Sequence, residues 1–390
     1  MKVAIYSGGI QAPTFIRRLM MGLADQGIDV LVFGPNNGKP PPAHRHIHVY
    51  ENKRGLAGHL QFIGRWFKAL LVCRSEVHAY YAQVQHQWPW ASATAWKAWQ
   101  KHLPVLLHKP DIFHLQWAVG TEEWFFLKQH FGIKMIVSLR GAHINYSPLF
   151  DAHLAESYRR YFPQVDAFHA VSKAIGREAS LYGASPNKIN VIYSGLPLNE
   201  FPWPVQKTKQ AARTINILSV GRAHWKKGYR YAIDAIHALK QKGYAVQYTI
   251  IGGMATEHVH HIAQLNLQEN VIIKQRVPFD EVKATMMQTH ILLLPSVEEG
   301  IANVVLEAMA LGTLVVSSNC GGMEEAIEHQ VSGFIFPLRN VDAMVNCLEQ
   351  AIAIEPEAYQ QITSRARQYI ESHHTAELLV QKMIQLYQSI

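Results

Sequence analysis

Short apolar runs recur along this chain and alternate with longer amphipathic segments, and this alternation most restricts the possible folds. In the first half the runs are rich in β-branched and aromatic residues; they lie at 2–6, 29–33, 111–115, 134–139, 166–171 and 189–193. Residues 13–27 are typical of the amphipathic helices between such runs. Strands that alternate with helices favour a parallel sheet covered on both faces. The first half is therefore predicted to be a doubly wound α/β domain.

The same alternation begins again after the proline-bearing segment 201–213. Strands are predicted at 215–220, 247–252, 271–274, 291–294 and 313–318, and helices at 229–242, 257–266, 280–287, 303–311, 323–329 and 341–353. We expect two Rossmann-like domains, 1–203 and 204–372, which face each other across a cleft. A C-terminal helix at about 373–390 is expected to pack back on the first domain. Open sheets of this kind bind ligands at the carboxyl ends of their strands.

The positive charge of the chain is concentrated in its first half. Residues 1–200 contain 21 Lys and Arg against 12 Asp and Glu, a net charge of +9, whereas residues 201–390 contain 16 against 17. A basic half is typical of proteins that contact nucleic acid, an anionic membrane or a phosphorylated small molecule. The composition, with 48% hydrophobic and 17% charged residues, is that of a globular protein.

Segment 55–108 interrupts the alternation of strands and helices. It contains the tryptophans Trp66, Trp88, Trp90, Trp96 and Trp99 among basic residues. The favoured interpretation is that helices pack on the first sheet with these tryptophans in the core. The alternative is an interfacial surface that meets lipid headgroups.

The cellular location of the protein and its metal binding are predicted from sequence patterns that the chain lacks. The N-terminus has no secretory-signal pattern, and no apolar run of the chain is long enough to span a bilayer. We therefore expect a cytoplasmic protein. The three cysteines lie far apart, and the histidine clusters have no cysteine or acidic partners at metal-ligand spacing. No metal site is predicted.

Two glycine-bearing turns follow predicted strands and precede helices. Gly8 and Gly9 allow close approach of a ligand to the backbone, and the next helix directs N–H groups toward an anion. In VGRAHWKKG, 220–228, Arg222 and Lys227 suit a diphosphate, although a solvated basic loop is equally consistent with the residues. Glycines also occur at 321–322, after another strand.

The segment EEGIANVVLEAMALG, 298–312, combines a very apolar helix with two acidic residues. The helix should begin near Asn303, so the N–H groups of 302–305 are expected to be unpaired donors that could bind a phosphate. Glu299 would precede the helix, and Glu307 would lie one turn inside it. The two could face one ligand, or be an exposed loop acid and a buried acid paired to a basic side chain.

These motifs together resemble the family-four retaining glycosyltransferases of GT-B fold. The resemblance is closest over about 215–340, where VGRAHWKKG, IIGG, LLLPSVEEG, EGIANVVLEAMALG, GG and SGFIFP occur in order. It is looser in the first half, through SGG, KPDIFHLQ and AVSKAIGREASLYG. Polysaccharide and glycolipid synthesis are the processes that the resemblance suggests.

The resemblance implies a role for each matching residue. Arg222 and Lys227 would bind the donor diphosphate and stabilise the leaving group, Glu299 would bind the donor sugar, and Glu307 the ribose. The remaining donor contacts would come from Gly8, Gly9, Arg276, Val277, Ile301, Ala302, Asn303 and Val304. The family usually needs no metal, so the only expected co-substrate is a nucleotide diphosphate sugar.

One motif departs from the family pattern. Where relatives often have a histidine followed by Gly-x-Asp, this chain has SLRGAHIN, with Arg140 at the histidine position and His143 at the aspartate position. Arg140 could bind phosphate or an acidic acceptor, or form a structural ion pair. Together with His114 of KPDIFHLQ, these residues are the candidates for the acceptor or sugar side.

The sequence thus predicts a retaining hexosyltransferase that moves a sugar from a nucleotide diphosphate sugar to a glycan or lipid-linked hydroxyl. Its basic half could contact the inner face of an anionic membrane. The alternatives are a sugar-nucleotide epimerase of similar architecture and a non-enzymatic nucleic-acid-binding protein. Acidic residues at the expected site would repel a polyanion, which disfavours nucleic acid as a partner.

Overall fold

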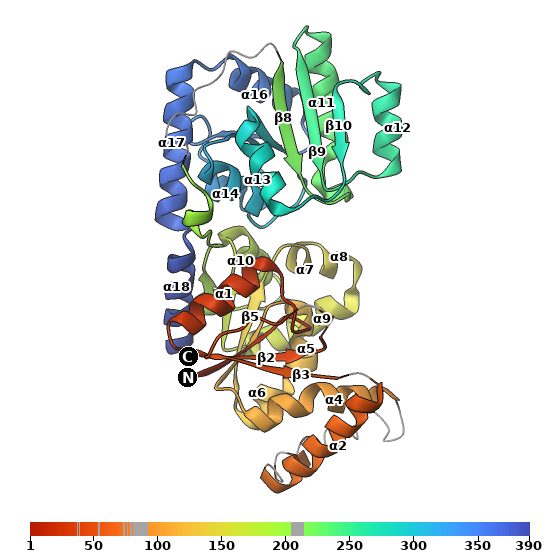
Figure 1. Ribbon diagram of the computed structural model, residues 1–390, viewed down its shortest axis with the longest axis vertical. Coiled ribbons are helices and arrows are strands. Elements are labelled where there is room, and N and C mark those ends of the chain that lie inside the picture. The colour runs from red at the N-terminus through yellow and green to blue at the C-terminus, as the bar shows by residue number, and fades with distance from the viewer. Residues whose placement is uncertain are drawn as a thin grey trace. The chain divides into compact units, whose positions relative to one another are not determined.

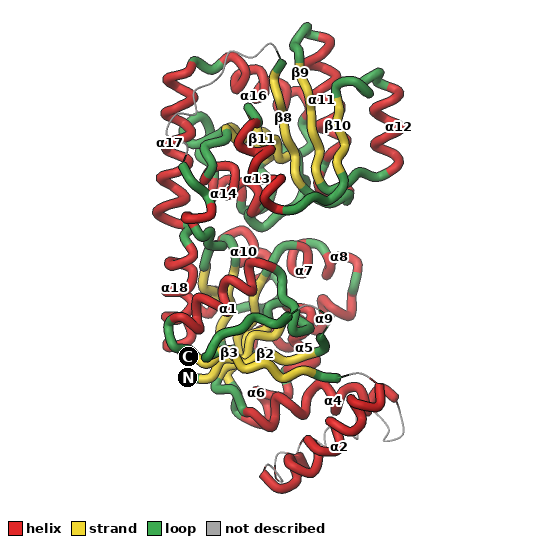
Figure 2. Tube along the Cα trace, viewed as in Figure 1, coloured by secondary structure: helices red, strands yellow, loops and turns green. Residues whose placement is uncertain are grey.

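The computed structural model describes residues 1–36, 38, 40–53, 55–72, 75, 77–78, 80, 93–203 and 214–390. Trp88 and Trp90, the side chain of Trp96, and most of the segment 201–213 lie outside the described part. The chain forms two compact units. Unit 1 comprises 1–171, 176–192 and 379–390, and unit 2 comprises 172–175 and 193–378. Figures 1 and 2 show the elements of each unit.

Unit 1 contains a seven-stranded parallel sheet with the order β3-β2-β1-β4-β5-β6-β7. The strands are β1 Lys2–Tyr6, β2 Asp29–Gly34, β3 Ile47–Glu51, β4 Ile112–Leu115, β5 Lys134–Leu139, β6 Ala167–Ala170 and β7 Ile189–Val191. The strand order reverses direction between β1 and β4. This switch point opens a crevice at the carboxyl ends of the two strands, where open α/β sheets bind ligands.

The helices of unit 1 differ greatly in length. The longer ones are α1 Thr14–Asp25, α2 Gly55–Val72, α4 Ala93–His108, α9 Ala152–Tyr161, α10 Lys173–Ser180 and α18 Ala376–Gln388. Short helices are α5 Thr121–Trp124, α6 Phe126–Phe131, α7 Ala142–Asn145 and α8 Ser147–Phe150, with 3-10 turns η1 Ala118–Gly120, η2 Phe162–Gln164 and η3 Pro186–Lys188. Helix α18 packs on α1, because Gly22 leaves room for Val380: a Cβ at Gly22 would lie 2.4 Å from Val380 Cγ2.

Unit 2 contains a six-stranded parallel sheet with the order β10-β9-β8-β11-β12-β13. The strands are β8 Ile215–Val220, β9 Val246–Ile251, β10 Val271–Lys274, β11 Ile291–Leu294, β12 Leu314–Ser318 and β13 Phe334–Phe336. The helices are α11 Tyr229–Gln241, α12 Thr256–Gln264, α13 Phe279–Gln288, α14 Asn303–Ala310, α15 Met323–Ala326, α16 Val341–Ala353 and α17 Pro356–His373, with η4 Leu198–Glu200 and η5 Trp225–Lys227. The switch point of this sheet lies between β8 and β11.

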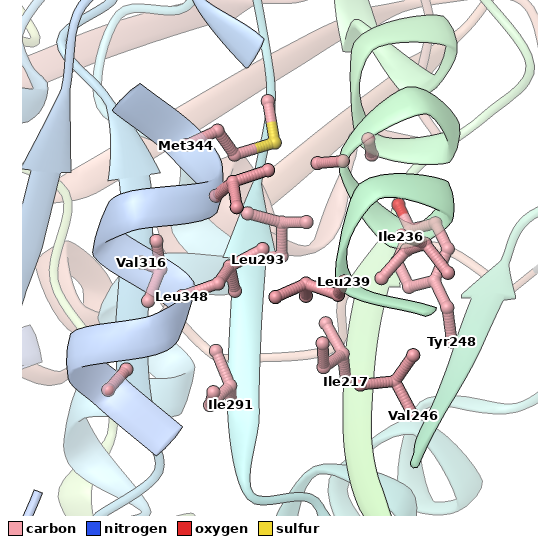
Figure 3. Packing of buried hydrophobic residues seen from close by; sticks show 14 of the residues in the cluster. Ile217, Ile236, Leu239, Val246, Tyr248, Ile291, Leu293, Val316, Met344 and Leu348 are labelled. Carbon is pink, nitrogen blue, oxygen red and sulfur yellow. The ribbon is translucent and has the colours of Figure 1, made fainter. Parts of the chain in front are cut away.

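Alternate residues of the unit 2 strands face opposite layers of helices. On one face Ile217, Leu293 and Val316 pack with the helices α11 and α16, and Figure 3 shows Leu239 and Leu348 meeting them there. On the other face Leu218, Leu292 and Val315 pack against α14 and α17. Because side chains alternate along a strand, a sheet buried on both faces requires the continuous apolar runs seen in the sequence.

The two predicted parallel sheets are confirmed, but two strands were missing from the prediction. Strand β3 contains His48, Tyr50 and Glu51, and β13 is three residues long. Both are edge strands, and edge strands need not be long or uniformly apolar. The structure also differs from the predicted boundary at 203, because residues from Tyr193 onward belong to unit 2. From Leu379, α18 belongs to unit 1.

Candidate functional site

The loops that follow β8, β11 and β12, together with helix α14, carry most of the predicted donor residues. These strands are neighbours in the unit 2 sheet, so their carboxyl ends meet at one edge. The loop after β8 carries Lys227, the loop after β11 carries Glu299, and the loop after β12 carries Gly321 and Gly322. The site therefore forms at the switch point of the sheet, the expected ligand position in this architecture.

Lys227 and Glu299 form an ion pair at this edge. Lys227 Nζ lies 2.7 Å from Glu299 Oε1, and both side chains are only 16% exposed. Ser296 Oγ also donates to Glu299 Oε1, over 3.2 Å. The sequence predicted that both charged residues lie near one ligand, but it did not predict their contact with each other. The pair holds a cation and an anion side by side, partly shielded from solvent.

The backbone of the two loops is tightly interlocked. The N–H of Val297 donates to Lys226 O over 2.7 Å. Gly228 has a left-handed φ of +67°, and a Cβ there would lie 1.9 Å from Pro295 O. Only glycine accepts this conformation and this contact at once. The loop after β8 is thus held against the loop after β11, which positions Lys227 beside Glu299.

The loop after β12 closes on the same segment from the other side. Gly321 has a φ of +54°, and a Cβ there would lie 1.8 Å from Glu299 O. The Gly322 N–H donates to Gly300 O over 2.6 Å. Ser318 Oγ donates to Ser296 O. The sequence indicated a glycine turn at 321–322, but its contact with Glu299 arises only because β11 and β12 are adjacent.

Helix α14 begins at Asn303 as predicted, but its first-turn donors are only partly available. The N–H of Ala302 contacts Met323 Sδ at 3.4 Å, and the N–H of Val305 donates to Ala302 O. The expectation that all four groups from 302 to 305 are unpaired is therefore wrong. The N–H groups of Asn303 and Val304 remain in the first turn, where helix geometry gives them no partner within the helix.

Glu307 is half-buried on α14, whereas the flanking apolar side chains of the helix are buried. The structure therefore shows a partly accessible carboxylate in place of the fully buried acid that the sequence allowed. Ile301 and Val304 pack against the apolar cluster beneath the helix. Their apolar side chains hold the segment in place, so any polar contact with a ligand would come from their backbone.

Three further donor candidates lie on the same edge of unit 2, one in the loop after β8 and two in the loop after β10. Arg222 is exposed, immediately after β8. Arg276 is exposed and Val277 half-buried, both after β10. Strand β10 is the outer strand on the β8 side of the sheet. These residues could reach a ligand that extends from the switch point toward β10.

Unit 1 has its own pocket at the carboxyl ends of its strands. The pocket has a volume of about 630 Å³ and is lined by residues that follow β1, β2, β3 and β4, and by α4. Gly8, with a φ of +91°, is part of its wall. Gly9 lies against the loop after β2, since a Cβ there would lie 3.3 Å from Pro35 O.

The charged lining of this pocket was not predicted. Lys53, Lys97 and Lys101 line it together with one acid, Glu123. Lys101 Nζ lies 2.5 Å from Glu123 Oε2, and Lys101 and His102 hold the pKa of Glu123 at about 2 even though burial raises it. The only sequence signal was the spacing of Lys97 and Lys101, which places both on one helical face.

Arg140 lies at the end of β5 without a carboxylate partner among the described residues. Its Nη2 donates to Gln116 Oε1 over 3.1 Å, and its guanidinium lies 4.7 Å from the ring centroid of Phe15. Burial lowers the pKa of Arg140 to about 10. Arg140 Nε and Gln116 Nε2 are shielded from solvent and have no hydrogen-bond partner among the described residues. The predicted alternative of a structural ion pair is thus not found in the described part of the chain.

His114 has an internal position that differs from its expected place beside a sugar. It is fully buried. Its Nδ1 lies 2.8 Å from Tyr387 Oη and its Nε2 lies 2.8 Å from Ser138 Oγ, which also contacts His169 Nδ1 at 2.8 Å. Both ring nitrogens are engaged, so His114 joins β4 to β5 and α18 within the core. His143 lies on α7, with its ring 5.4 Å from that of Trp117.

The buried histidines should make unit 1 sensitive to acid. Burial lowers the pKa of His169 to about 3. Below the unfolded pKa of about 6.5 the unfolded chain binds a proton that the folded chain does not, so stability falls by about 1.4 kcal/mol per pH unit for each such group. We expect His169→Gln to lose less stability than wild type between pH 7 and pH 5 in urea unfolding. His153→Gln, at an exposed position, should follow wild type; equal pH dependence in all three proteins would contradict the assignment.

Two family models match the chain in succession. Residues 12–200 match the model described as Glycosyltransferase Family 4, and residues 205–369 match the model described as Glycosyl transferases group 1. The chain belongs to the family-four glycosyltransferases of GT-B fold.

Curated relatives match over part of their length. The chain is 30% identical to the amylovoran biosynthesis glycosyltransferase AmsK of Erwinia amylovora over 261 residues, which is 63% of each chain. It is 30% identical to the putative colanic acid biosynthesis glycosyltransferase WcaL of Escherichia coli over 247 residues, 61% of this chain and 60% of the relative. The matched region thus spans about three fifths of the length of these relatives.

Solved structures of low sequence identity share the whole fold. Sucrose-phosphate synthase from Thermosynechococcus elongatus has a TM-score of 0.76 at 17% identity, covering 100% of this chain and 98% of that one. Anabaena HepE in complex with UDP and glucose has a TM-score of 0.69 at 18% identity, with full coverage of both chains. Within the described residues, no helix is both long and apolar enough to cross a bilayer, and no cluster of His, Cys, Asp and Glu is arranged to hold a metal ion.

Proposed function

We propose that this protein transfers a hexosyl group from a nucleoside diphosphate sugar to an acceptor hydroxyl during polysaccharide synthesis, with retention of configuration. The observation that carries the proposal is the Lys227–Glu299 pair at the switch point of unit 2, beside the N-terminus of α14. Family membership and relatives named for polysaccharide biosynthesis support the reaction class. The epimerase and the nucleic-acid-binding protein are not favoured by these relatives.

The donor would place its diphosphate between the loop after β8 and the start of α14. Departure of the diphosphate from the sugar develops negative charge on oxygen, and Arg222, Lys227 and the α14 amides would stabilise that charge. Side chains and helix amides, rather than a metal ion, would thus neutralise the leaving group. A solved relative in fold, HepE, is described in complex with UDP-glucose, which supports a nucleotide sugar as the donor class.

Glu299 and Glu307 would hold two different parts of the donor. Glu299 accepts hydrogen bonds from Lys227 and Ser296 on one oxygen, Oε1, so Oε2 can accept from a sugar hydroxyl. Glu307 is half-buried and one turn inside α14, and it would accept from the ribose hydroxyls. The sugar contact, before the start of α14, and the ribose contact, inside α14, would thus lie at different heights along the axis of this helix.

The test is thermal-shift measurement of wild type, Glu299→Ala and Glu307→Ala against UDP, GDP and a panel of their sugars. Glu307→Ala should reduce the shift for the nucleotides and their sugars alike. Glu299→Ala should retain the shift for UDP or GDP alone and lose about 1–2 kcal/mol of the extra stabilisation by the preferred sugar. Equal loss for every ligand in both variants would contradict the separate roles, and the absence of any shift in wild type would overturn the donor class.

The acceptor would bind in the unit 1 pocket near Gly8. Its three lysines against one glutamate favour an acceptor that carries negative charge, such as an acidic sugar or a phosphate. Arg140 and Gln116 lie at the same edge of the sheet and have donor atoms to spare, so they would contribute to an anionic group. Product analysis by NMR, which reports the anomeric configuration, tests retention; an inverted linkage would refute that part of the proposal.

A further inference from the structure

Helix α2 exposes a continuous apolar face to solvent. Its large apolar residues Leu56, Leu60, Ile63, Phe67, Leu70 and Leu71 are between 38% and 87% exposed. At 3.6 residues per turn they fall within an arc of about 100°. We call these six residues the α2 apolar face. An exposed apolar surface of this extent marks an interaction site in most proteins.

The opposite side of α2 is attached to unit 1. Phe62 and Ala69 are buried, and Trp66 meets Trp99 of α4 with ring centroids 4.7 Å apart. Arg65 Nη1 donates to Asn52 Oδ1 over 2.7 Å. Figure 1 shows α4 between α2 and the sheet, with α2 projecting from unit 1. The helix is therefore held by one face, and the α2 apolar face points away from the protein.

The favoured interpretation, in which the tryptophans of segment 55–108 pack in the core, is confirmed for Trp66 and Trp99, and the alternative of an interfacial tryptophan surface is wrong for these two. The described ones in this segment, Trp66 and Trp99, contact each other between α2 and α4. The aliphatic residues and Phe67 form the exposed surface instead.

The charge around the α2 apolar face indicates what covers it. Residues 52–110 contain eight Lys and Arg and one acidic residue, Glu76. Neither α2 nor α4 contains an Asp or Glu. A second copy of this chain docked on the face would bring two basic, nearly acid-free segments together, which is unfavourable. An anionic surface is complementary to the segment.

We propose that the α2 apolar face docks this protein on the surface of an anionic lipid bilayer, with α2 lying in the plane of the interface. The apolar residues would enter the boundary between headgroups and acyl chains, and Lys68 would meet lipid phosphates. An in-plane orientation fits α2, because none of the described helices is long and apolar enough to cross the bilayer. Docking of this kind goes beyond the proposed transfer reaction and does not depend on it.

The docking is tested by flotation of the full chain with vesicles, with no donor or acceptor present. Wild type should float with vesicles of phosphatidylglycerol and phosphatidylcholine, and far less with phosphatidylcholine alone. Leu60→Ser/Ile63→Ser/Phe67→Ser should lower vesicle affinity by about tenfold or more. The matched control Leu181→Ser/Val259→Ser/Ile272→Ser removes three exposed apolar side chains elsewhere and should bind as wild type does.

Charge is tested separately with Lys68→Glu, which should weaken binding to the anionic vesicles by about fivefold or more at low salt.

Failure of wild type to float, or equal flotation of the Leu60/Ile63/Phe67 variant, would overturn the proposal. Sedimentation of wild type and of the Leu60/Ile63/Phe67 variant tests whether a second copy of the chain covers the α2 apolar face instead. If wild type is a dimer, the variant is a monomer and neither binds vesicles, the face is a dimer interface and lipid docking is refuted. Donor binding measured by thermal shift reports on the transfer site independently.

Discussion

Replacement of Lys227 by alanine is expected to lower kcat by about a hundredfold to a thousandfold, the effect of removing one well-placed charge donor from a transition state. Lys227 is only 16% exposed and is held beside Glu299, so its ammonium is oriented before the donor arrives. A preoriented charge in a partly shielded site stabilises a departing diphosphate more than a mobile surface lysine does. Steady-state turnover with the donor identified by thermal shift measures the effect.

The matched control is Lys242→Ala. Lys242 forms an ion pair of the same type, 2.8 Å from Glu349, but it follows the C-terminal end of α11, away from the strand ends that form the site. This variant should keep wild-type turnover, because an exposed ion pair contributes little. Equal turnover of the Lys227 and Lys242 variants would remove Lys227 from the catalytic residues. Thermal unfolding of both variants shows whether a loss of turnover reflects a loss of folded protein.

Replacement of Gly228 by alanine is expected to destabilise unit 2 by about 3 kcal/mol or more. The residue has a φ of +67°, and a Cβ would lie 1.9 Å from Pro295 O and 2.8 Å from Pro295 C. The clashing atoms are backbone, so no side-chain rotation can relieve the contact. The loops after β8 and β11 would have to separate, which would also move Lys227 away from Glu299.

Gly243→Ala provides the control for left-handed backbone strain alone. Gly243 has a φ of +87°, and a Cβ there would find no atom within 4 Å. The cost should be about 1–2 kcal/mol. Thermal unfolding of the two variants separates strain from the clash between loops; an equal decrease in Tm would show that the approach of Gly228 to Pro295 is not important for stability. Donor binding should be impaired only in the Gly228 variant.

Much of the fold could be predicted because both sheets are buried on two faces. Residues such as 291–294, ILLL, are apolar at every position, since alternate side chains enter different helical layers. The predicted strand at 134–139 and helix at 341–353 have the bounds found in the structure. Edge strands such as β3 are covered less completely, so their mixed composition gave no comparable signal.

The order of motifs was enough to place Lys227 and Glu299 in loops at the ends of strands. It could not show their contact, because the two residues are 72 positions apart and meet only since β8 and β11 pair in the sheet. The same limit applies to Arg140. Its substitution for the usual histidine is visible in the sequence, but the absence of a carboxylate partner among the described residues depends on what β4, α1 and α18 bring near it.

By itself the sequence determined two parallel sheets, the family and the loops that carry charge, because apolar periodicity and local turn residues act over a few neighbouring positions. Only the tertiary structure decided which charges meet and which surfaces remain open. Helix α2 illustrates the physical reason. It has apolar residues on two sides, and their spacing alone does not predict which side packs against unit 1. Packing of Phe62 and Ala69 toward unit 1 leaves Leu60 and Phe67 exposed, which makes that face available to a partner.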